Sequence, residues 1–208
     1  MSVGVVIPFR GLGLGKSRLR ASMPGEAVDR LMLAMLANVV RAIGEAQPGA
    51  PLIIVAQSAA GIAAPRSRII ERSLSLNDAV EFARGCFADQ GVRRVAAFSS
   101  DLPLLRAQEV SALLLAEADV AVAPDVGGQG TNALVFPASA QGFACFGAGS
   151  ARVHRERAAQ LGLTACSVST PGLAQDVDTI ADINGAVRAA CAWPAKARET
   201  SSDHAPSY

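Results

Sequence analysis

Short apolar runs alternate along this chain with longer segments whose apolar side chains recur at helical spacing. Val3 to Pro8 is apolar throughout and predicts a buried strand. From Glu26 to Glu45 the apolar residues recur every three or four positions, which predicts an amphipathic helix with Gly44 near its end. The chain therefore begins with a strand, a loop and a long helix.

The same patterns continue to the end of the chain. Further strands are expected at 52–56, 95–99, 120–123, 132–136 and 163–168, with a short one at 68–70 and a short strand or turn near Ala174. Further helices are expected at 77–90, where Asn77 is the expected N-cap and Gly91 the stop, and at 107–117, 150–161 and 182–192.

Strands and helices that alternate in this way predict an α/β fold. We expect a single domain over residues 1–193, built as a mainly parallel twisted sheet with helices on both faces. Residues 194–208 are Ser, Pro, Lys and Asp with almost no apolar side chains, so they are expected to form a disordered tail.

Composition and charge exclude several classes of protein. Half of the residues are hydrophobic, and the net charge of +1 gives no global attraction to nucleic acid or to an anionic membrane surface. No apolar run reaches the roughly 18 residues that a membrane span needs, and no secretory leader is recognisable, so a cytoplasmic protein is expected. The four cysteines lie far apart in the sequence, which argues against a zinc site.

The first candidate site is the loop from Arg10 to Lys16, which follows the first strand. Glycines at alternate positions, among them Gly11 and Gly13, allow a tight bend whose N–H groups face a ligand, and Lys16, Arg10 and Arg18 add cationic donors. The loop suits a polyphosphate. It misses the ATPase P-loop pattern because Arg10 occupies the first glycine position. The alternative is a flexible loop whose basic side chains are simply solvated.

Three aspartates form the second candidate. Asp101 follows the strand at 95–99, and Asp176 and Asp178 are two positions apart, so in an extended segment both carboxylates point to the same side. Carboxylates held this close favour a cation between them, and hard oxygen ligands suit Mg²⁺ bound together with phosphates. The alternative is that Asp101 and Asp178 cap the following helices.

Further polar positions lie in three loops. Thr131 and Asn132 follow a glycine-rich stretch, and Gly147 and Ser150 precede a helix whose N-terminal N–H groups could bind an anion. Leu76, Asn77 and Asp78 could read a base edge. The alternative is a hairpin turn for the first loop, a serine N-cap for the second and a helix cap for the third. His154 is expected to be a structural residue behind the site.

Taken in order, these motifs resemble a known enzyme family. The chain is similar to the guanylyltransferases of deazaflavin coenzyme F-420 biosynthesis, which act on 2-phospho-L-lactate, phosphoenolpyruvate or 3-phosphoglycerate and have a nucleotide-diphospho-sugar-transferase-like, Rossmann-like fold. The resemblance rests on Ile7-Pro, Lys16-Ser-Arg-Leu, Ser75-Leu-Asn77, Ser100-Asp101-Leu-Pro-Leu-Leu, Pro124-Asp125, Gly130-Thr131-Asn132-Ala-Leu, Phe146-Gly-x-Gly-Ser150 with His154, and Asp176-Val-Asp178-Thr-x-Ala-Asp.

The resemblance implies GTP as the donor, pyrophosphate as the leaving group and two Mg²⁺ ions. It implies metal ligation by Asp101, Asp176 and Asp178. It places the contacts of the acceptor on Thr131, Gly147 and Ser150, with Asn132 beside them. It places the phosphate-loop lysine on Lys16 and base recognition on Leu76, Asn77 and Asp78.

The sequence departs from the family pattern at Arg10, where lysine is usual, at Val126, where a basic residue is frequent, and at Ala151, where an aromatic is frequent. These changes leave the aspartates intact and affect the acceptor and phosphate contacts. Two other functions stay open: a related nucleotidyltransferase with a molybdopterin or sugar-like acceptor, and a non-catalytic nucleotide-binding regulator. The sequence also leaves open whether the chain is a monomer or a homodimer.

Overall fold

The computed structural model describes residues 2–192. The expected tail at 194–208 lies outside these residues. The strands are β1 (Val3–Phe9), β2 (Leu52–Ala56), β3 (Ser67–Glu71), β4 (Arg94–Phe98), β5 (Val120–Pro124), β6 (Thr131–Pro137) and β7 (Ala165–Ser167). The helices are α1 (Ser17–Arg20), α2 (Gly25–Ala46), α3 (Leu76–Asp89), α4 (Ala107–Leu114), α5 (Ser150–Gln160), α6 (Pro171–Ala174), the 3₁₀ turn η1 (Ile180–Asp182) and α7 (Gly185–Ala190).

All seven strands form one sheet in the order β3-β2-β1-β4-β6-β5-β7. The pairs β1–β2, β1–β4, β2–β3 and β5–β7 are parallel, whereas β6 runs antiparallel to both β4 and β5. The glycine-rich loop at 125–130 joins β5 to its antiparallel neighbour β6, so it is the hairpin turn that the sequence left open. The mainly parallel sheet is confirmed.

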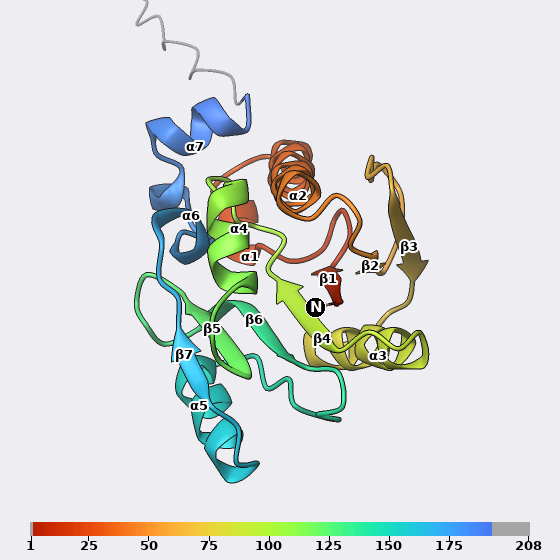
Figure 1. Cartoon of the computed structure of the whole chain (residues 1–208). Coiled ribbons are helices and arrows are strands. Elements are labelled where there is room, and N and C mark those ends of the chain that lie inside the picture. Colours follow the sequence, from red (N-terminus) through yellow and green to blue (C-terminus); the bar gives the residue numbers. More distant parts are fainter. Residues whose placement is uncertain (1, 193–208) are drawn as a thin grey trace, which may run out of the picture.

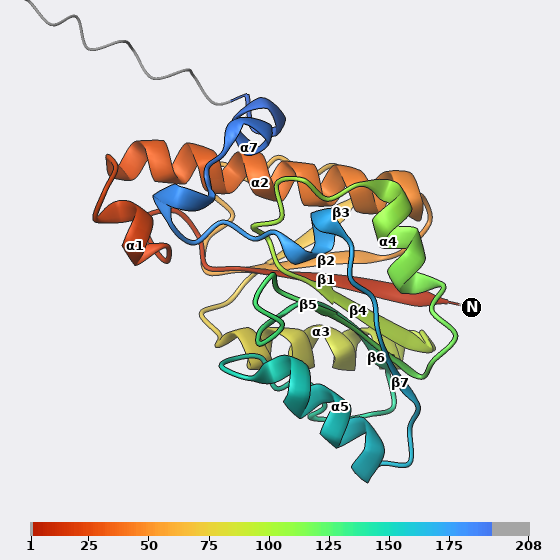
Figure 2. The ribbon, with the colours of Figure 1, turned by 90° about the vertical axis from the view of Figure 1, so that its left-hand side faces the viewer.

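Helices cover both faces of the sheet, as Figures 1 and 2 show. Successive residues of a strand point to opposite faces, so Val5 and Ile7 of β1 pack towards α2 and α4, whereas Val6 packs towards α3 and α5. Most of the central strand residues are fully buried because both faces are covered, which explains why they form continuous apolar runs rather than alternating patterns.

Several element ends differ from the expectations. The N-cap of α3 is Ser75, whose hydroxyl accepts a hydrogen bond from the Asp78 N–H at 3.2 Å, so the prediction of Asn77 was wrong. The final helix begins at Gly185 rather than at residue 182. The Asp182 carboxylate instead accepts hydrogen bonds from the Asp178 and Thr179 N–H groups at 3.0 and 2.7 Å, which closes a separate 3₁₀ turn.

The short segment near Ala174 is helix α6, neither a strand nor a turn. The last strand spans 165–167 rather than 163–168, and these are the three residues that pair with β5. Helix α1, directly after the glycine loop, was not predicted from the sequence. A helix of four residues has no hydrophobic periodicity from which it could be recognised.

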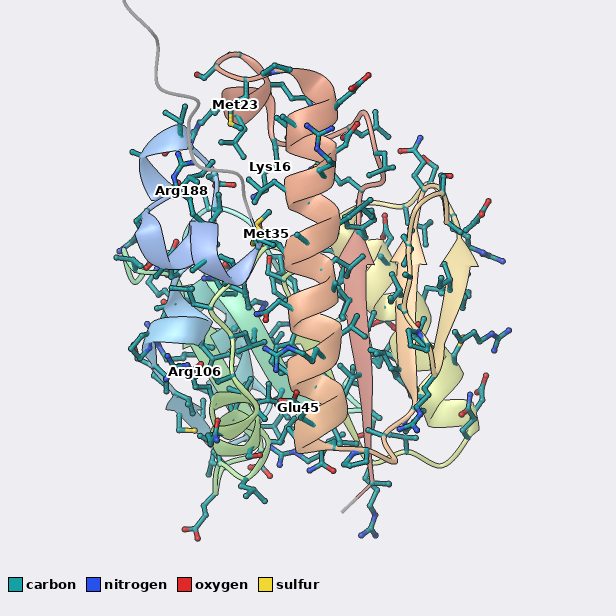
Figure 3. All side chains as sticks on the ribbon, turned by 90° about the horizontal axis from the view of Figure 1, so that it is seen from above. Lys16, Met23, Met35, Glu45, Arg106 and Arg188 are labelled. Carbon is teal, nitrogen blue, oxygen red and sulfur yellow. The ribbon has the colours of Figure 1, made fainter. Side chains whose placement is uncertain are left out.

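The sheet brings the candidate chemistry to one edge. The loop after β1 and the Asp101 segment after β4 both leave the carboxyl ends of strands that pair in the sheet. Chain connections diverge on either side of this β1–β4 pair, which is where open α/β sheets bind ligands. Lys16 lies towards the Met23 end of α2, away from the end that carries Glu45 (Figure 3).

No helix in the part of the chain that the structure describes is both long enough and apolar enough to cross a membrane. All four cysteines are free thiols and half-buried.

Candidate active site

A cavity of about 770 Å³ opens at this edge of the sheet. Its wall includes Arg10 and Lys16 from the loop after β1, Leu76 at the start of α3, Asp101 after β4, and Asp178. Segments from four parts of the sequence therefore meet in one space. Arg18 is exposed on α1 and does not line this cavity.

The glycine loop has the backbone conformation that its sequence suggests. Gly11, Gly13 and Gly15 have φ angles of 92°, 75° and 70°, and Lys16 follows at φ 50°. Only glycine adopts positive φ without steric cost, which explains the alternating glycines. The left-handed backbone at Lys16 directs the chain into α1.

A clamp that the sequence reasoning missed holds this loop. Arg20 donates a hydrogen bond from Nε to the Gly15 carbonyl at 3.0 Å and forms an ion pair with Asp29 of α2. The Asp29 carboxylate also accepts the Gly13 N–H at 2.9 Å, so this N–H faces the protein in this conformation. Burial opposes the charge on Asp29, but the hydrogen bonds from Arg20 and Gly13 lower its pKa.

Lys16 lies between two of the candidate metal ligands. Its ammonium forms ion pairs with Asp101 and, at 2.7 Å, with Asp178, and only 12 % of its side chain is exposed. Burial disfavours its charged form, but the Asp101 carboxylate and then Asp178 outweigh burial and raise the pKa of Lys16 above its ordinary value. Lys16 thus remains charged and joins the glycine loop to the aspartates.

The three aspartates form the cluster expected of a cation site. Asp101, Asp176 and Asp178 each offer a carboxylate oxygen, and these oxygens lie within 4.8 Å of one another. Burial raises the pKa of Asp176, as do the nearby charges of Asp101 and Asp178. Within residues 2–192, Asp101 Oδ1 is buried without a hydrogen-bond partner. A buried carboxylate oxygen without a partner is costly, so these residues fit a divalent cation held by hard oxygen ligands.

The segment that carries Asp176 and Asp178 is tied to the sheet by Asn132. The Asn132 amide, 5 % exposed, donates to the Leu173 and Ala174 carbonyls at 3.1 and 2.9 Å, and Asp176 Oδ1 lies 3.5 Å away. Asn132, expected beside the acceptor, therefore faces the aspartate segment instead.

Close packing fixes the same segment at Gly172. The Gly172 N–H donates to Glu109 of α4 at 2.7 Å. A β-carbon at this glycine would lie 2.6 Å from the Leu104 carbonyl oxygen, closer than real contacts allow. Helix α6 can approach α4 only because residue 172 has no side chain.

The residues expected at the acceptor form a second polar cluster. The hydroxyls of Thr131 and Ser150 lie 3.1 Å apart, and the His154 ring contacts Thr131. Gly147 lies in the loop before α5, where its carbonyl accepts the Ser150 N–H at 3.1 Å. Neither Thr131 nor Ser150 belongs to the wall of the cavity described above. The two clusters are linked through Asn132, the neighbour of Thr131.

The three residues expected to recognise the base, Leu76, Asn77 and Asp78, make different contacts. Leu76 is 41 % exposed and lines the cavity. The Asn77 side chain donates to the Phe146 carbonyl at 3.2 Å and accepts the Phe146 N–H at 2.7 Å. Asp78 accepts a hydrogen bond from the Ser75 hydroxyl at 2.6 Å. In this conformation Asn77 therefore joins α3 to the loop before α5, and Leu76 is the one of the three in the cavity wall.

Arg72 is a further cation in the cavity wall that the sequence reasoning did not select. It follows β3, and its guanidinium lies over the Phe82 ring, 4.5 Å from the ring centroid. This cation–π contact holds the arginine beside the cavity. Its place directly after a strand, at the edge where ligands bind, was the signal that could have identified it.

Comparison with known proteins adds independent findings. The protein family described as "Guanylyl transferase CofC like" matches this chain over residues 3–187. The phosphoenolpyruvate guanylyltransferase of Chloroflexus aggregans is 34 % identical over 186 residues, covering 85 % of this chain and 92 % of that protein. The enzyme of the same name from Geodermatophilus obscurus is 38 % identical over 196 residues, covering 88 % and 87 %.

Solved structures share the fold at lower identity. A putative nucleotide-diphospho-sugar transferase from Desulfovibrio desulfuricans superposes with a TM-score of 0.70 at 18 % identity, covering 93 % of this chain and 94 % of that one. A nucleotidyl transferase from Methanothermobacter gives a TM-score of 0.62 at 16 % identity, covering 87 % and 94 %. At these identities the likeness concerns the fold, which is the nucleotide-diphospho-sugar-transferase fold expected from the sequence.

Proposed function

This chain belongs to the CofC-like guanylyl transferase family and is a nucleotidyltransferase, and on that basis we propose its full reaction. It moves GMP from GTP onto the phosphate of a three-carbon phospho-acid and releases pyrophosphate, as a step in coenzyme F-420 biosynthesis. Phosphoenolpyruvate, 2-phospho-L-lactate and 3-phosphoglycerate are the candidate acceptors. The relatives named as phosphoenolpyruvate guanylyltransferases favour the first of them.

One observation carries the proposal. Three carboxylates and a lysine converge at the mouth of the β1–β4 pair, beside a cavity large enough for a nucleotide. Transfer of a nucleotidyl group needs neutralisation of phosphate charge more than it needs a strong base, because the attacking phosphate oxygen is already anionic near neutral pH. Lys16 and Arg10 supply positive charge, and the three carboxylates would hold a divalent cation that supplies more.

In the proposed reaction an oxygen of the acceptor phosphate attacks the α-phosphorus of GTP while the bond to pyrophosphate breaks. Lys16 and Arg10, both in the cavity wall, bind the departing pyrophosphate charge. Asp101, Asp176 and Asp178 would hold Mg²⁺, which would supply positive charge to the phosphate oxygens. Thr131, Ser150 and Gly147 bind the acceptor. The product is a diphosphate-linked conjugate of GMP and the acid.

The choice among GTP, ATP and CTP as the nucleotide donor tests the proposed function. We expect kcat/KM for GTP to exceed that for ATP and CTP by about 100-fold or more, because a site built to hydrogen-bond one base edge rejects an analogue that lacks its groups. Of the residues expected to recognise the base, Leu76, Asn77 and Asp78, only Leu76 lines the cavity, so we propose that base recognition involves Leu76 and its neighbours Leu74 and Ser75. Pyrophosphate release with each nucleotide, at saturating Mg²⁺ and phosphoenolpyruvate, measures these constants. Equal values for GTP and ATP would contradict guanylyl transfer and favour a broader nucleotidyltransferase.

A further inference from the structure

His154 is buried behind the acceptor cluster and has no role in the reaction described above. Its side chain is fully buried on α5, stacked at 15° on Phe143 with ring centroids 6.1 Å apart. Phe146 meets it edge-on at 5.1 Å. Because solvent does not reach the ring, His154 cannot contact a substrate directly. Both of its ring nitrogens nevertheless have polar partners.

The contacts of the ring fix its tautomer. The Cys145 backbone N–H points at Nε2 from 2.9 Å, and a backbone N–H can only donate, so Nε2 must carry a lone pair. The proton of the neutral ring is therefore on Nδ1, which lies 3.1 Å from Thr131 Oγ1 and donates to it. Burial and then the charge of Arg157 lower the pKa of His154 to about 4, so the ring is neutral near pH 7.

This tautomer determines what the Thr131 hydroxyl can do. Thr131 Oγ1 accepts from His154, and it also accepts from the Ser150 hydroxyl at 3.1 Å. Both acceptor positions of the oxygen are then used, and the hydrogen of the Thr131 hydroxyl is left to donate. Even if the bond between the two hydroxyls ran the other way, one hydrogen of the pair would remain. The opposite histidine tautomer would instead draw the Thr131 hydrogen inwards to Nδ1.

We propose that His154 is a positioning residue that holds the Thr131–Ser150 hydroxyl pair as a hydrogen-bond donor to an anionic oxygen of the acceptor. This inference rests on the proposed function, in which these two hydroxyls bind the acceptor. Ser150 is 1 % exposed and Thr131 is partly exposed, so Thr131 is the member of the pair that a ligand can reach.

The hydroxyl pair also bears on which acceptor the site prefers. A hydroxyl whose acceptor positions are both used can only donate, and a donated hydrogen bond is stronger to a carboxylate or phosphate oxygen than to a neutral sugar hydroxyl. The pair therefore favours acceptors that present an anion at this point. Thr131 is adjacent to Asn132, whose amide anchors the segment of Asp176, so the donor stands beside the segment that carries the metal ligands.

Three substitutions separate this role from simple packing. His154→Phe keeps an aromatic ring but removes the donor to Thr131. In His154→Asn the side-chain amide can occupy the place of Nδ1 and keep a donor there. Thr131→Val removes the hydroxyl itself. Each is compared with wild type by kcat, by KM for phosphoenolpyruvate and by KM for GTP, with thermal melting as the control for folding.

For His154→Phe we expect KM for phosphoenolpyruvate to rise about tenfold, because one hydrogen bond to a charged group of the acceptor is lost. We expect kcat and KM for GTP to stay within about twofold of wild type. His154→Asn should recover most of the affinity. Adding His154→Phe to Thr131→Val should change KM for the acid no further, because residues that act through one group are not additive. Full additivity, or equal losses in the Phe and Asn variants, would overturn the inference.

The wild-type protein provides a readout that does not depend on folding of a variant. The chain has only two histidines, His154 and His204, so ¹⁵N-histidine labelling with a His204→Gln reference assigns both. The shifts of His154 should show a protonated Nδ1 and an unprotonated Nε2 from about pH 6 to pH 8. A protonated Nε2 contradicts the inference. Wild type that forms no product with any of the three acids contradicts the proposed function itself, whichever tautomer the spectrum shows.

Discussion

Asparagine in place of Asp101, Asp176 or Asp178 should each lower kcat by about 100-fold or more while the fold survives. Loss of one metal ligand removes several kcal/mol of charge stabilisation from the transition state, and about 2.7 kcal/mol corresponds to 100-fold. The three carboxylates lie together at the carboxyl edge of the sheet, and Asp101 Oδ1 has no hydrogen-bond partner among the residues that the structure describes. Asparagine keeps the size of each side chain and removes only its charge.

The measurement is kcat at saturating Mg²⁺, GTP and phosphoenolpyruvate, with circular dichroism to establish folding. Asp89→Asn is the matched control, because Asp89 is exposed at the opposite end of α3 from the cavity. We expect near-normal turnover from this control. Near-normal turnover in all three cluster variants would show that these carboxylates do not hold a catalytic metal.

Replacement of Lys16 by methionine should produce two opposite effects. Turnover should fall by about 100-fold, because the cation that binds the leaving pyrophosphate is lost. Binding of Mg²⁺ in the absence of nucleotide should become tighter, because the ammonium of Lys16 forms ion pairs with Asp101 and Asp178 and competes with a metal for the same carboxylates. Few other substitutions in an active site would strengthen metal binding while they impair turnover.

Calorimetric titration with MgCl₂ and steady-state kinetics measure the two effects. Arg30→Met serves as the control, since Arg30 is an exposed cation on α2 outside the cavity. It should leave both quantities unchanged. If Lys16→Met binds Mg²⁺ no more tightly than wild type, the lysine does not occupy the cation site; if its turnover is normal, it does not bind the pyrophosphate.

The sheet and its covering helices could be predicted from sequence because they depend on local patterns. The apolar runs of β1, β2 and β4 are buried on both faces, and α2 repeats its apolar residues at helical spacing over 22 residues. Short elements such as α1 and α6 contain too few residues for such a pattern. They form because the preceding loop and the neighbouring helix constrain them.

The candidate aspartates could be selected because each follows a strand or lies in an i, i+2 pattern, which the chain shows directly. The partners of several polar side chains could not be found in this way. Asn77 binds the backbone of Phe146, 69 residues away, and Asn132 binds the Leu173 carbonyl, 41 residues away. Local sequence does not encode whether an amide side chain faces a ligand or holds a distant segment of the chain. The same reason hid the Arg20–Asp29 clamp.

The acceptor remains the most specific part of the proposed function, and mass-resolved product formation tests it most directly. The enzyme is incubated with GTP and Mg²⁺ and with phosphoenolpyruvate, 2-phospho-L-lactate or 3-phosphoglycerate, beside a hexose 1-phosphate control. We predict a product with the mass of GMP joined to one of the acids, one pyrophosphate released for each product, and no product from the sugar phosphate. Product from the sugar phosphate and none from the three acids would contradict the account.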